Sequence, residues 1–352
     1  MIIDFHTHTF PEKIAAGAID KLSHTSHSRA LTDGTENGLL AHMRMSGVTH
    51  SVILPVATAA RQVPRINDAS ARLNEARGGE GLISFASMHP DFANVREELV
   101  RVRDLGFRGI KIHPVYQGAN LDGPAFLRIL EICAELGLLV VTHAGLDIGF
   151  PGVVRAAPSM ALHALRELKN GRASRMREGG SLYPEKEREA SMEAGLQTAA
   201  KALSEIGCSP SRTPAENGGF RLILAHMGGW RNWEEVAILA QSLCEAGPVM
   251  IDTAFSTGAF PPLDDGYWKE EETKMLGKRA FVSIIRAFGA HRVLFGSDAP
   301  WGSQKDTLDF VEETDLTETE KAFILWKNAE RLLGNNVTSH SRAKHSLFGT
   351  GR

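Results

Sequence analysis

Eight short apolar segments, rich in β-branched residues, recur along the 352-residue chain and end in or beside Gly, Pro, His or Asp. They cover residues 1–8, 50–56, 81–89, 107–113, 138–143, 221–226, 249–254 and 292–298. Between them lie segments with apolar residues at helical spacing, for example residues 94–105, 125–136 and 233–246. Near-continuous apolar strands are buried on both faces, which is typical of a parallel sheet covered by helices. Eight such units predict an α/β fold, a closed (β/α)8 TIM barrel.

An open, doubly wound sheet is the alternative fold for alternating strands and helices. No glycine-rich GxGxxG motif follows the first strand, which disfavours a dinucleotide-binding version of that fold. The composition, 43% hydrophobic and 23% charged, is globular, and no apolar run approaches the ~20 residues of a membrane-spanning helix. Because the net charge is −3 and Lys and Arg are scattered, we expect neither nucleic acid nor a membrane as partner.

Two segments fall outside the repeat. Residues 170–219 form a polar insertion between the fifth and sixth strands, with a charged helical part near residues 185–206. Such an insertion suits a lid, a substrate-shaping subdomain or an oligomer contact, so a homo-oligomer is one expected arrangement. We expect residues 1–334 to form the barrel domain and residues 335–352 a flexible tail. Three cysteines outside CxxC pairs, and no secretory segment at the start, predict a cytoplasmic location.

Five of the fourteen histidines, all at predicted strand ends, are predicted to point to one rim of the barrel. These are His6 and His8 on the first strand, His113 on the fourth, His143 on the fifth and His226 on the sixth, and Asp298 ends the eighth. A spacing of two places His6 and His8 on the same face of their strand. The C-terminal ends of barrel strands meet at one rim, where the active site lies. An HxH pair alone is a weak signal, but this convergence predicts a divalent metal site.

Imidazoles together with a carboxylate suit Zn²⁺, with Fe²⁺, Mn²⁺ and Co²⁺ as alternatives. A catalytic site keeps one position open for water, whose pKa falls from about 15.7 toward about 7 on binding. Asp298 could then accept the water proton and pass it to a leaving group. The expected partner is therefore a small-molecule substrate.

Six motifs together resemble the amidohydrolase superfamily, in particular its amidohydrolase-2 branch. They are DFHTH, KIHP, THAGLDIGFPG, LAHMGGW, LFGSDAPWG and the terminal WKNAERLLG, and the resemblance covers residues 1–334 except the insertion. It implies that His6, His8, His143 and Asp298 bind the metal. By the same analogy, His226 contacts the substrate or the metal-bound water.

Lys111 decides between one metal ion and two. Binuclear members of the superfamily place a carboxylated lysine on the fourth strand, and Lys111 lies there, two residues before His113 and on the same face. We expect His113 at the rim and Lys111 one layer deeper. This placement favours a single metal ion and makes a second one through Lys111 unfavourable.

The substrate contacts are expected in the loops after the strands. Trp230 and Trp301 directly follow the sixth and eighth strands and could form the wall of a pocket or only pack. His113 is a further candidate contact. Tyr116 and Arg155, after the fourth and fifth strands, are candidates for holding an acidic substrate.

The leading hypothesis is a metal-dependent hydrolase in which activated water attacks an amide, lactone or ester carbon. A lyase that decarboxylates or hydrates a small carboxylic acid could use the same site, because fold and site do not name a reaction. A cluster of basic residues would favour the lyase, and the loops offer only Arg155, Arg231 and the basic residues of the insertion. A non-enzymatic binding module is the third alternative and requires a closed metal site.

Overall fold

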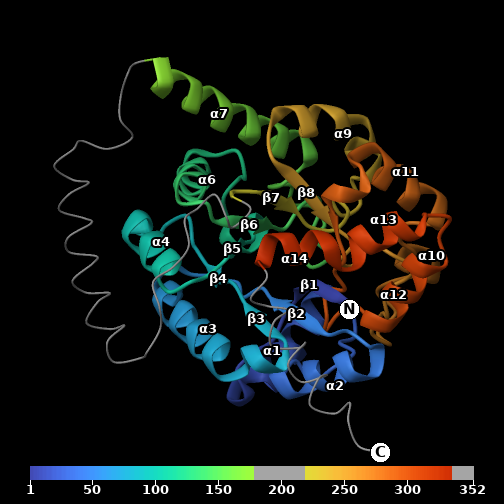
Figure 1. The fold of residues 1–352 in the computed structure, drawn as a ribbon. Helices are drawn as coiled ribbons and strands as arrows, with labels where there is room; N and C mark the ends of the chain where they lie inside the picture. Colours follow the sequence, from blue (N-terminus) through green and yellow to red (C-terminus); the bar gives the residue numbers. More distant parts are fainter. Residues whose placement is uncertain (178–218, 335–352) are drawn as a thin grey trace, which may run out of the picture.

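The computed structural model describes residues 1–177 and 219–334, and parallel strands form its centre (Figure 1). The strands are β1 (Ile3–Thr7), β2 (His50–Ile53), β3 (Leu82–Ser84), β4 (Ala86–Ser87), β5 (Gly109–Ile112), β6 (Leu139–Thr142), β7 (Leu222–Leu224), β8 (Val249–Asp252) and β9 (Val293–Leu294). β1 to β3 pair in chain order, and so do β4 to β9, in parallel throughout. Parallel neighbours require long crossover connections, and helices supply them here.

Backbone hydrogen bonds join these two sheets into one closed barrel. Only Phe85 separates β3 from β4, and its N–H donates to Ile53 O of β2 at 2.9 Å, so β3 and β4 act as one strand. On the other side, the Phe5 N–H of β1 donates to Phe295 O, just after β9, at 2.7 Å. The predicted barrel of eight parallel strands is confirmed.

Helices surround the barrel (Figure 1). They are α1 (Glu12–Ser26), α2 (Glu36–Ser46), α3 (Val63–Arg77), α4 (Val95–Asp104), α5 (Pro114–Gln117), α6 (Pro124–Leu136), α7 (Pro158–Arg177), α9 (Trp233–Ala246), α10 (Glu270–Thr273), α11 (Lys278–Phe288), α12 (Gln304–Glu312), α13 (Glu318–Ala322) and α14 (Asn328–Leu333). In α6, Phe126, Ile129, Leu130 and Cys133 recur every three or four residues and are all buried. Gly137 ends this helix at φ 70°, a left-handed backbone conformation that costs glycine little energy because glycine has no Cβ.

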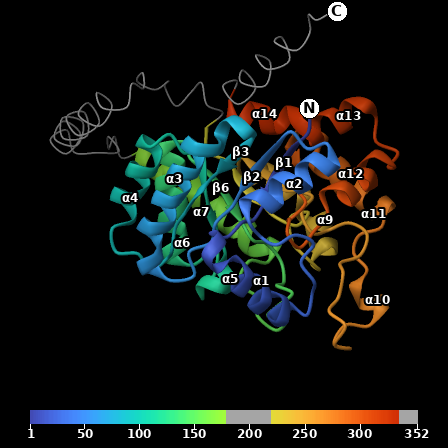
Figure 2. The same cartoon turned by 90° about the horizontal axis from the view of Figure 1, so that it is seen from below.

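The barrel interior is filled by apolar side chains from nearly every strand. Ile3, Val52 and Val141 belong to this cluster, and α14 adds Leu332 and Leu333 to it. α14 therefore closes the N-terminal end of the barrel. Figure 2 shows α14 and the N-terminus at one end of the molecule and α1, α5 and α10 at the opposite end. The opposite end, formed by the C-terminal ends of the strands, therefore remains available for a functional site, as the sequence predicts.

α7 continues to Arg177, beyond residue 170 where the insertion was predicted to begin. The rest of the predicted insertion, including its charged helical part, and the predicted tail lie outside the described residues. Their roles stay predictions. Within the described ranges, no helix combines the length and the apolar character that crossing a membrane requires.

Candidate metal centre and substrate site

A bulge in β1 directs His6 into the barrel. Asp4 pairs with Ser51 and Thr7 pairs with Ile53, so β1 contains one residue more than β2 between these two pairs. The side chain of Phe5 lies in the interior cluster, yet that of His6 also faces inward, where it meets Asp252. An extra residue in one strand breaks the usual alternation, which explains how two consecutive side chains point to the same side.

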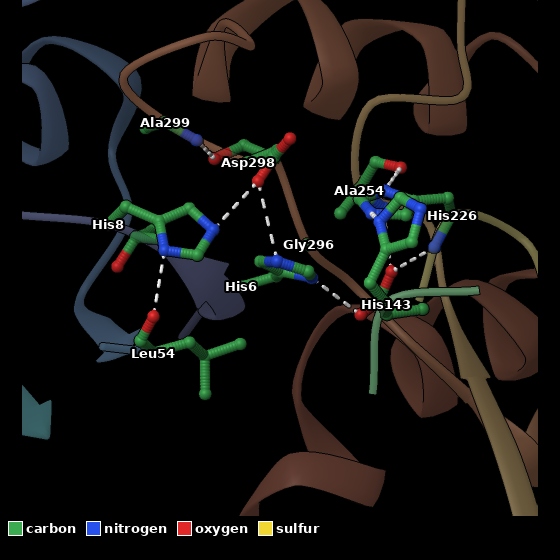
Figure 3. A network of polar contacts seen from close by, with 12 residues as sticks. His6, His8, Leu54, His143, His226, Ala254, Gly296, Asp298 and Ala299 are labelled. Atoms are coloured by element: carbon green, nitrogen blue, oxygen red, sulfur yellow. Dashed lines mark hydrogen bonds and ion pairs between the residues drawn. The ribbon is translucent and has the colours of Figure 1, made fainter. Parts of the chain in front are cut away.

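His6, His8 and Asp298 form a compact group of ligand atoms (Figure 3). Asp298 Oδ1 lies 3.3 Å from His6 Nε2 and 3.1 Å from His8 Nε2. His6 Nδ1 faces Asp252 Oδ2, and His8 Nδ1 faces Leu54 O, each at 2.8 Å. A carboxylate and a carbonyl only accept hydrogen bonds, so both Nδ1 atoms carry the proton and both Nε2 lone pairs point toward Asp298. Two imidazole lone pairs and a carboxylate suit a divalent metal ion.

The protonation states of this group also suit a cation. Burial lowers the pKa of His6 well below its usual value, so the imidazole is neutral at pH 7. Burial raises the pKa of Asp298, but contacts with His8 and His6 when these imidazoles are protonated outweigh that effect, and the pKa lies well below the usual range. A neutral imidazole and an ionised carboxylate are the forms that bind metals.

His143 and His226 form a second pair. His143 Nε2 faces Leu146 O at 3.1 Å, and His226 Nδ1 faces Ala254 O at 3.0 Å, so these nitrogens carry the protons. The remaining nitrogens, His143 Nδ1 and His226 Nε2, face each other at 3.1 Å. Both would be acceptors in a neutral pair, so a proton or a cation has to lie between them. The ring of His226 is 5.3 Å from that of His6, which connects the pair to the first group.

Strained backbone positions mark the same rim. His226 has φ 61° and Asp298 φ 69°, a left-handed conformation that is uncommon for residues with a side chain. Asp252 supports the first of them, because its Oδ1 accepts the His226 N–H at 2.9 Å. Gly296 allows a close approach, since a Cβ at this position would lie 2.9 Å from His6 Cβ. Such outliers persist where surrounding contacts hold them, and functional sites are enriched in them.

Lys111 is buried more deeply than the half-buried His113, as expected, with 1% of its surface exposed. Its long side chain nevertheless reaches the centre, because Nζ donates to His6 Nε2 at 3.2 Å. Burial lowers the pKa of Lys111 to about 8. A single metal ion stays the prediction.

The other predicted substrate residues occupy different surroundings. Trp230 is buried in an aromatic cluster with Phe255 and Phe260. Trp301 packs against this cluster and borders a cavity of about 330 Å³. The guanidinium of Arg155 donates to Asn120 Oδ1 at 3.1 Å.

His113 and Tyr116 lie beside His143. The His113 ring stacks on His143 with centroids 4.3 Å apart, and the Tyr116 ring meets it edge-on at 4.5 Å. Asp147, a buried residue in the loop after β6, completes a group with His113 and His143. Asp147 was not among the residues expected from the sequence. The available signal was a carboxylate four residues after His143, in the loop that follows a strand.

The chain belongs to the amidohydrolase family: the family's sequence model matches residues 3–334. This confirms the resemblance of the motifs, and the protein is an enzyme of the amidohydrolase superfamily. No curated protein sequence matches the chain significantly.

Solved structures share its barrel. 5-Carboxyvanillate decarboxylase from Sphingomonas paucimobilis is 15% identical with a TM-score of 0.60, over 94% of this chain and 98% of that one. A dihydroxybenzoic acid decarboxylase from Polaromonas sp. JS666 with bound manganese is 15% identical with a TM-score of 0.58, over 95% and 97%. A probable 2-pyrone-4,6-dicarboxylic acid hydrolase from Acinetobacter baumannii is 16% identical with a TM-score of 0.51, over 95% and 99%. At these identities the likeness establishes the fold.

Proposed function

We propose that the protein is a metal-dependent hydrolase in which activated water attacks an amide, lactone or ester carbon of a small molecule. The supporting observation is the convergence of His6 Nε2, His8 Nε2 and Asp298 Oδ1, with both Nδ1 atoms held by acceptors. His143 would complete the ligand set. A divalent ion held there would activate water and polarise a substrate oxygen. We propose zinc, with manganese, iron or cobalt as alternatives; the Polaromonas decarboxylase of the same fold holds manganese.

The chain's own residues would then handle protons and substrate. Oδ1 of Asp298 contacts both imidazoles, which leaves the second oxygen to accept a proton from water and return it to the leaving group. His226, held through Nδ1 by Ala254 O, presents Nε2 to the centre as a contact for water or substrate. Trp301 borders the cavity together with Phe255, Phe260 and Phe310, and we propose it as part of a pocket wall.

Among the described side chains, the arginines give no support for decarboxylation. A decarboxylase would use a cation to hold its substrate carboxylate, and the candidates in the sequence were Arg155, Arg231 and the basic residues of the insertion, most of which lies outside the described residues. Arg155 donates to Asn120 Oδ1, and Arg231 donates to Lys274 O at 2.9 Å and to the carbonyl of Glu272. These bonds of the two guanidinium groups therefore go to an amide and to backbone carbonyls.

Decarboxylation or hydration of a small acid is the second candidate. One observation favours it: Lys111 places a buried ammonium group 3.2 Å from His6 Nε2, where it could balance a substrate carboxylate. Two of the structural relatives named above are described as decarboxylases.

We also propose a cytoplasmic location and a homo-oligomer for this protein, and both proposals rest on the sequence alone.

Metal analysis combined with two substrate panels tests the proposal. The purified protein is analysed for zinc, manganese, iron and cobalt by mass spectrometry, then stripped and reloaded with each. Esters, lactones and amides are assayed for hydrolysis, and aromatic and unsaturated acids for release of CO₂. His8→Asn should lower metal content and turnover, whereas His24→Asn, at an exposed histidine of α1, should change neither.

Hydrolysis without release of CO₂ would support the proposal. Release of CO₂ without hydrolysis would contradict the proposed hydrolase and support the second candidate, a decarboxylase. A protein that retains none of the four metals, and stays inactive after reloading with each, would contradict both candidates.

A further inference from the structure

A buried carboxylate lies beside the histidines without contributing to the His6–His8–Asp298 group. Asp147 is 4% exposed, in the loop between β6 and α7. Its Oδ1 accepts a hydrogen bond from Gly149 N at 2.8 Å. Its Oδ2 faces His113 Nε2 at 3.5 Å and His143 Nε2 at 4.0 Å. Both distances exceed the usual limit of about 3.2 Å for N–H···O bonds, so neither imidazole takes up the acceptor capacity of Oδ2. The backbone N–H of Phe150 is a further donor to this carboxylate, which leaves part of its capacity to accept.

Asp147, His113 and His143 have ligand atoms within 4.8 Å of one another, but the tautomers disfavour a metal ion there. Tyr116 N donates to His113 Nδ1 in a long hydrogen bond of 3.4 Å, which favours the tautomer of the neutral imidazole with the proton on Nε2. His143 Nε2 likewise carries a proton, because it faces Leu146 O at 3.1 Å. Both nitrogens that face Asp147 are therefore donors, and no imidazole lone pair points toward Oδ2. A site with one free acceptor suits a ligand that donates hydrogen bonds.

Aromatic rings border this carboxylate and connect it to the surface. The Tyr116 ring meets His113 edge-on at 4.5 Å and Phe150 edge-on at 5.4 Å. Phe150 is 39% exposed, so the aromatic wall extends to solvent. Burial, reinforced by Asp147 and Asp298, raises the pKa of Tyr116, so its phenol stays neutral. The surroundings combine one negative acceptor with apolar faces.

We propose that Asp147 binds a hydrogen-bond donor of the substrate, an amine or a hydroxyl carried on an aromatic or similarly apolar group. The same carboxylate excludes a substrate carboxylate from this position by repulsion. His143 separates Asp147 from His226, so the donor lies one imidazole ring away from the place where we put the reaction. The inference rests on the proposed hydrolase function and specifies the substrate class of that site.

Binding of three small probes to the metal-loaded protein tests this inference without requiring turnover. Benzylamine is a cationic donor, benzyl alcohol a neutral donor and benzoate an anion, all on the same ring. Calorimetry or ligand-observed NMR should show that the wild type prefers benzylamine to benzoate. In Asp147→Asn, which keeps the shape of the side chain, the affinity for benzylamine should fall about tenfold or more, as expected when a hydrogen bond to a charged group is lost. Binding of benzoate should strengthen.

Asp122→Asn is the matched control. Asp122 also pairs with a histidine, His163 Nδ1 at 3.1 Å, but on an exposed surface. This variant should bind all three probes as the wild type does, and Asp147→Glu, which keeps the charge, should retain the preference for benzylamine. The inference is wrong if Asp147→Asn leaves the order of the three probes unchanged, or if Asp147→Glu loses the preference as Asp147→Asn does.

The proposed function can fail separately. Absence of hydrolysis by the wild type with any metal would remove the hydrolase, while a charge-dependent order of probes would still establish the donor site. If hydrolysis does not depend on donor groups of the substrate, and Asp147→Asn leaves the order of the probes unchanged, the hydrolase function would be supported and the inference about Asp147 would be wrong.

Discussion

Asp252→Asn tests whether the carboxylate behind His6 prepares that histidine to bind metal. Asp252 is fully buried; its Oδ2 faces His6 Nδ1 at 2.8 Å and its Oδ1 accepts the His226 N–H at 2.9 Å. The amide oxygen of Asn can keep the bond from His226, but its NH₂ group then meets His6 Nδ1–H, and two donors repel. His6 can respond by moving its proton to Nε2, which removes the lone pair that a metal needs.

The expected losses of metal affinity and of stability in this variant are similar in size, before the offset from neutralising a buried charge is counted. Loss of a carboxylate that orients a metal-binding histidine costs about 10- to 100-fold in metal affinity, or roughly 1.4–2.8 kcal/mol. Loss of a charged hydrogen bond costs about 1.5–3 kcal/mol of unfolding free energy. Burial raises the pKa of Asp252, which shows that its charge is itself unfavourable there, and neutralisation offsets part of that cost. We therefore expect the metal-free variant to fold.

Competition with a chromophoric chelator measures the affinity, and urea unfolding of the metal-free protein measures the stability. Asp4→Asn is the matched control, because Asp4 is an equally buried carboxylate with no imidazole nitrogen among its partners. Its Oδ2 accepts from Ser297 Oγ at 2.5 Å and Gln304 Nε2 at 2.8 Å, and its Oδ1 accepts the backbone N–H groups of His6 and Ser297, which an Asn oxygen can also accept. Asp4→Asn should retain the wild-type metal affinity. Equal losses of affinity in both variants would refute the reasoning, because the loss would then follow from neutralising any buried carboxylate.

Three further outcomes follow from the same contacts. Removing the metal with a chelator should lower the melting temperature in calorimetry, because an ion that binds only the folded chain adds about 2.7 kcal/mol at 100 times its Kd; equal melting temperatures with and without metal would contradict a site in the folded protein. Gly296→Ala should destabilise the protein by about 1–3 kcal/mol in urea unfolding, since the new Cβ would lie 2.9 Å from His6 Cβ, whereas Gly17→Ala in α1 adds a methyl group with nothing within 4 Å and should not destabilise. Burial lowers the pKa of His42 below 6.5, so below that pH the unfolded chain binds more protons than the folded protein. The free energy of unfolding therefore falls as the pH decreases. His42→Gln should reduce this dependence between about pH 7.5 and 5.5, and an unchanged dependence would show that His42 does not contribute to it.

The strand order and the location of the site could be predicted because they depend on residue types at regular spacing. Apolar runs mark the strands whichever side chains they contain, and parallel strands in a barrel all end at one rim. His6, His8 and Asp298 therefore meet although they come from the two ends of the chain. The helix expected at residues 233–246 is α9, with the same bounds, and its buried apolar residues recur every three or four positions.

Other details depend on contacts that residue types do not encode. Strict alternation places consecutive side chains such as Phe5 and His6 on opposite faces, and only the bulge in β1 brings both inside. Arg155 was a candidate for holding an acidic substrate, and its bond to Asn120 Oδ1 is a contact that the sequence does not predict. Asp147 lies in a loop, where no periodicity predicts the direction of a side chain.

In His6, His8, His143 and His226, which ring nitrogen carries the proton depends mainly on backbone carbonyl groups. Because every residue has such a carbonyl, the residue types in the sequence do not predict these tautomers. His8, His143 and His226 each have one ring nitrogen directed at a carbonyl oxygen, from Leu54, Leu146 and Ala254 respectively. Every residue carries such a carbonyl, so replacing those three side chains would leave the tautomers unchanged. His6 differs, because a side chain, Asp252, holds its Nδ1. Of the four tautomers, the one at His6 is therefore the one that a single substitution of its acceptor can reverse.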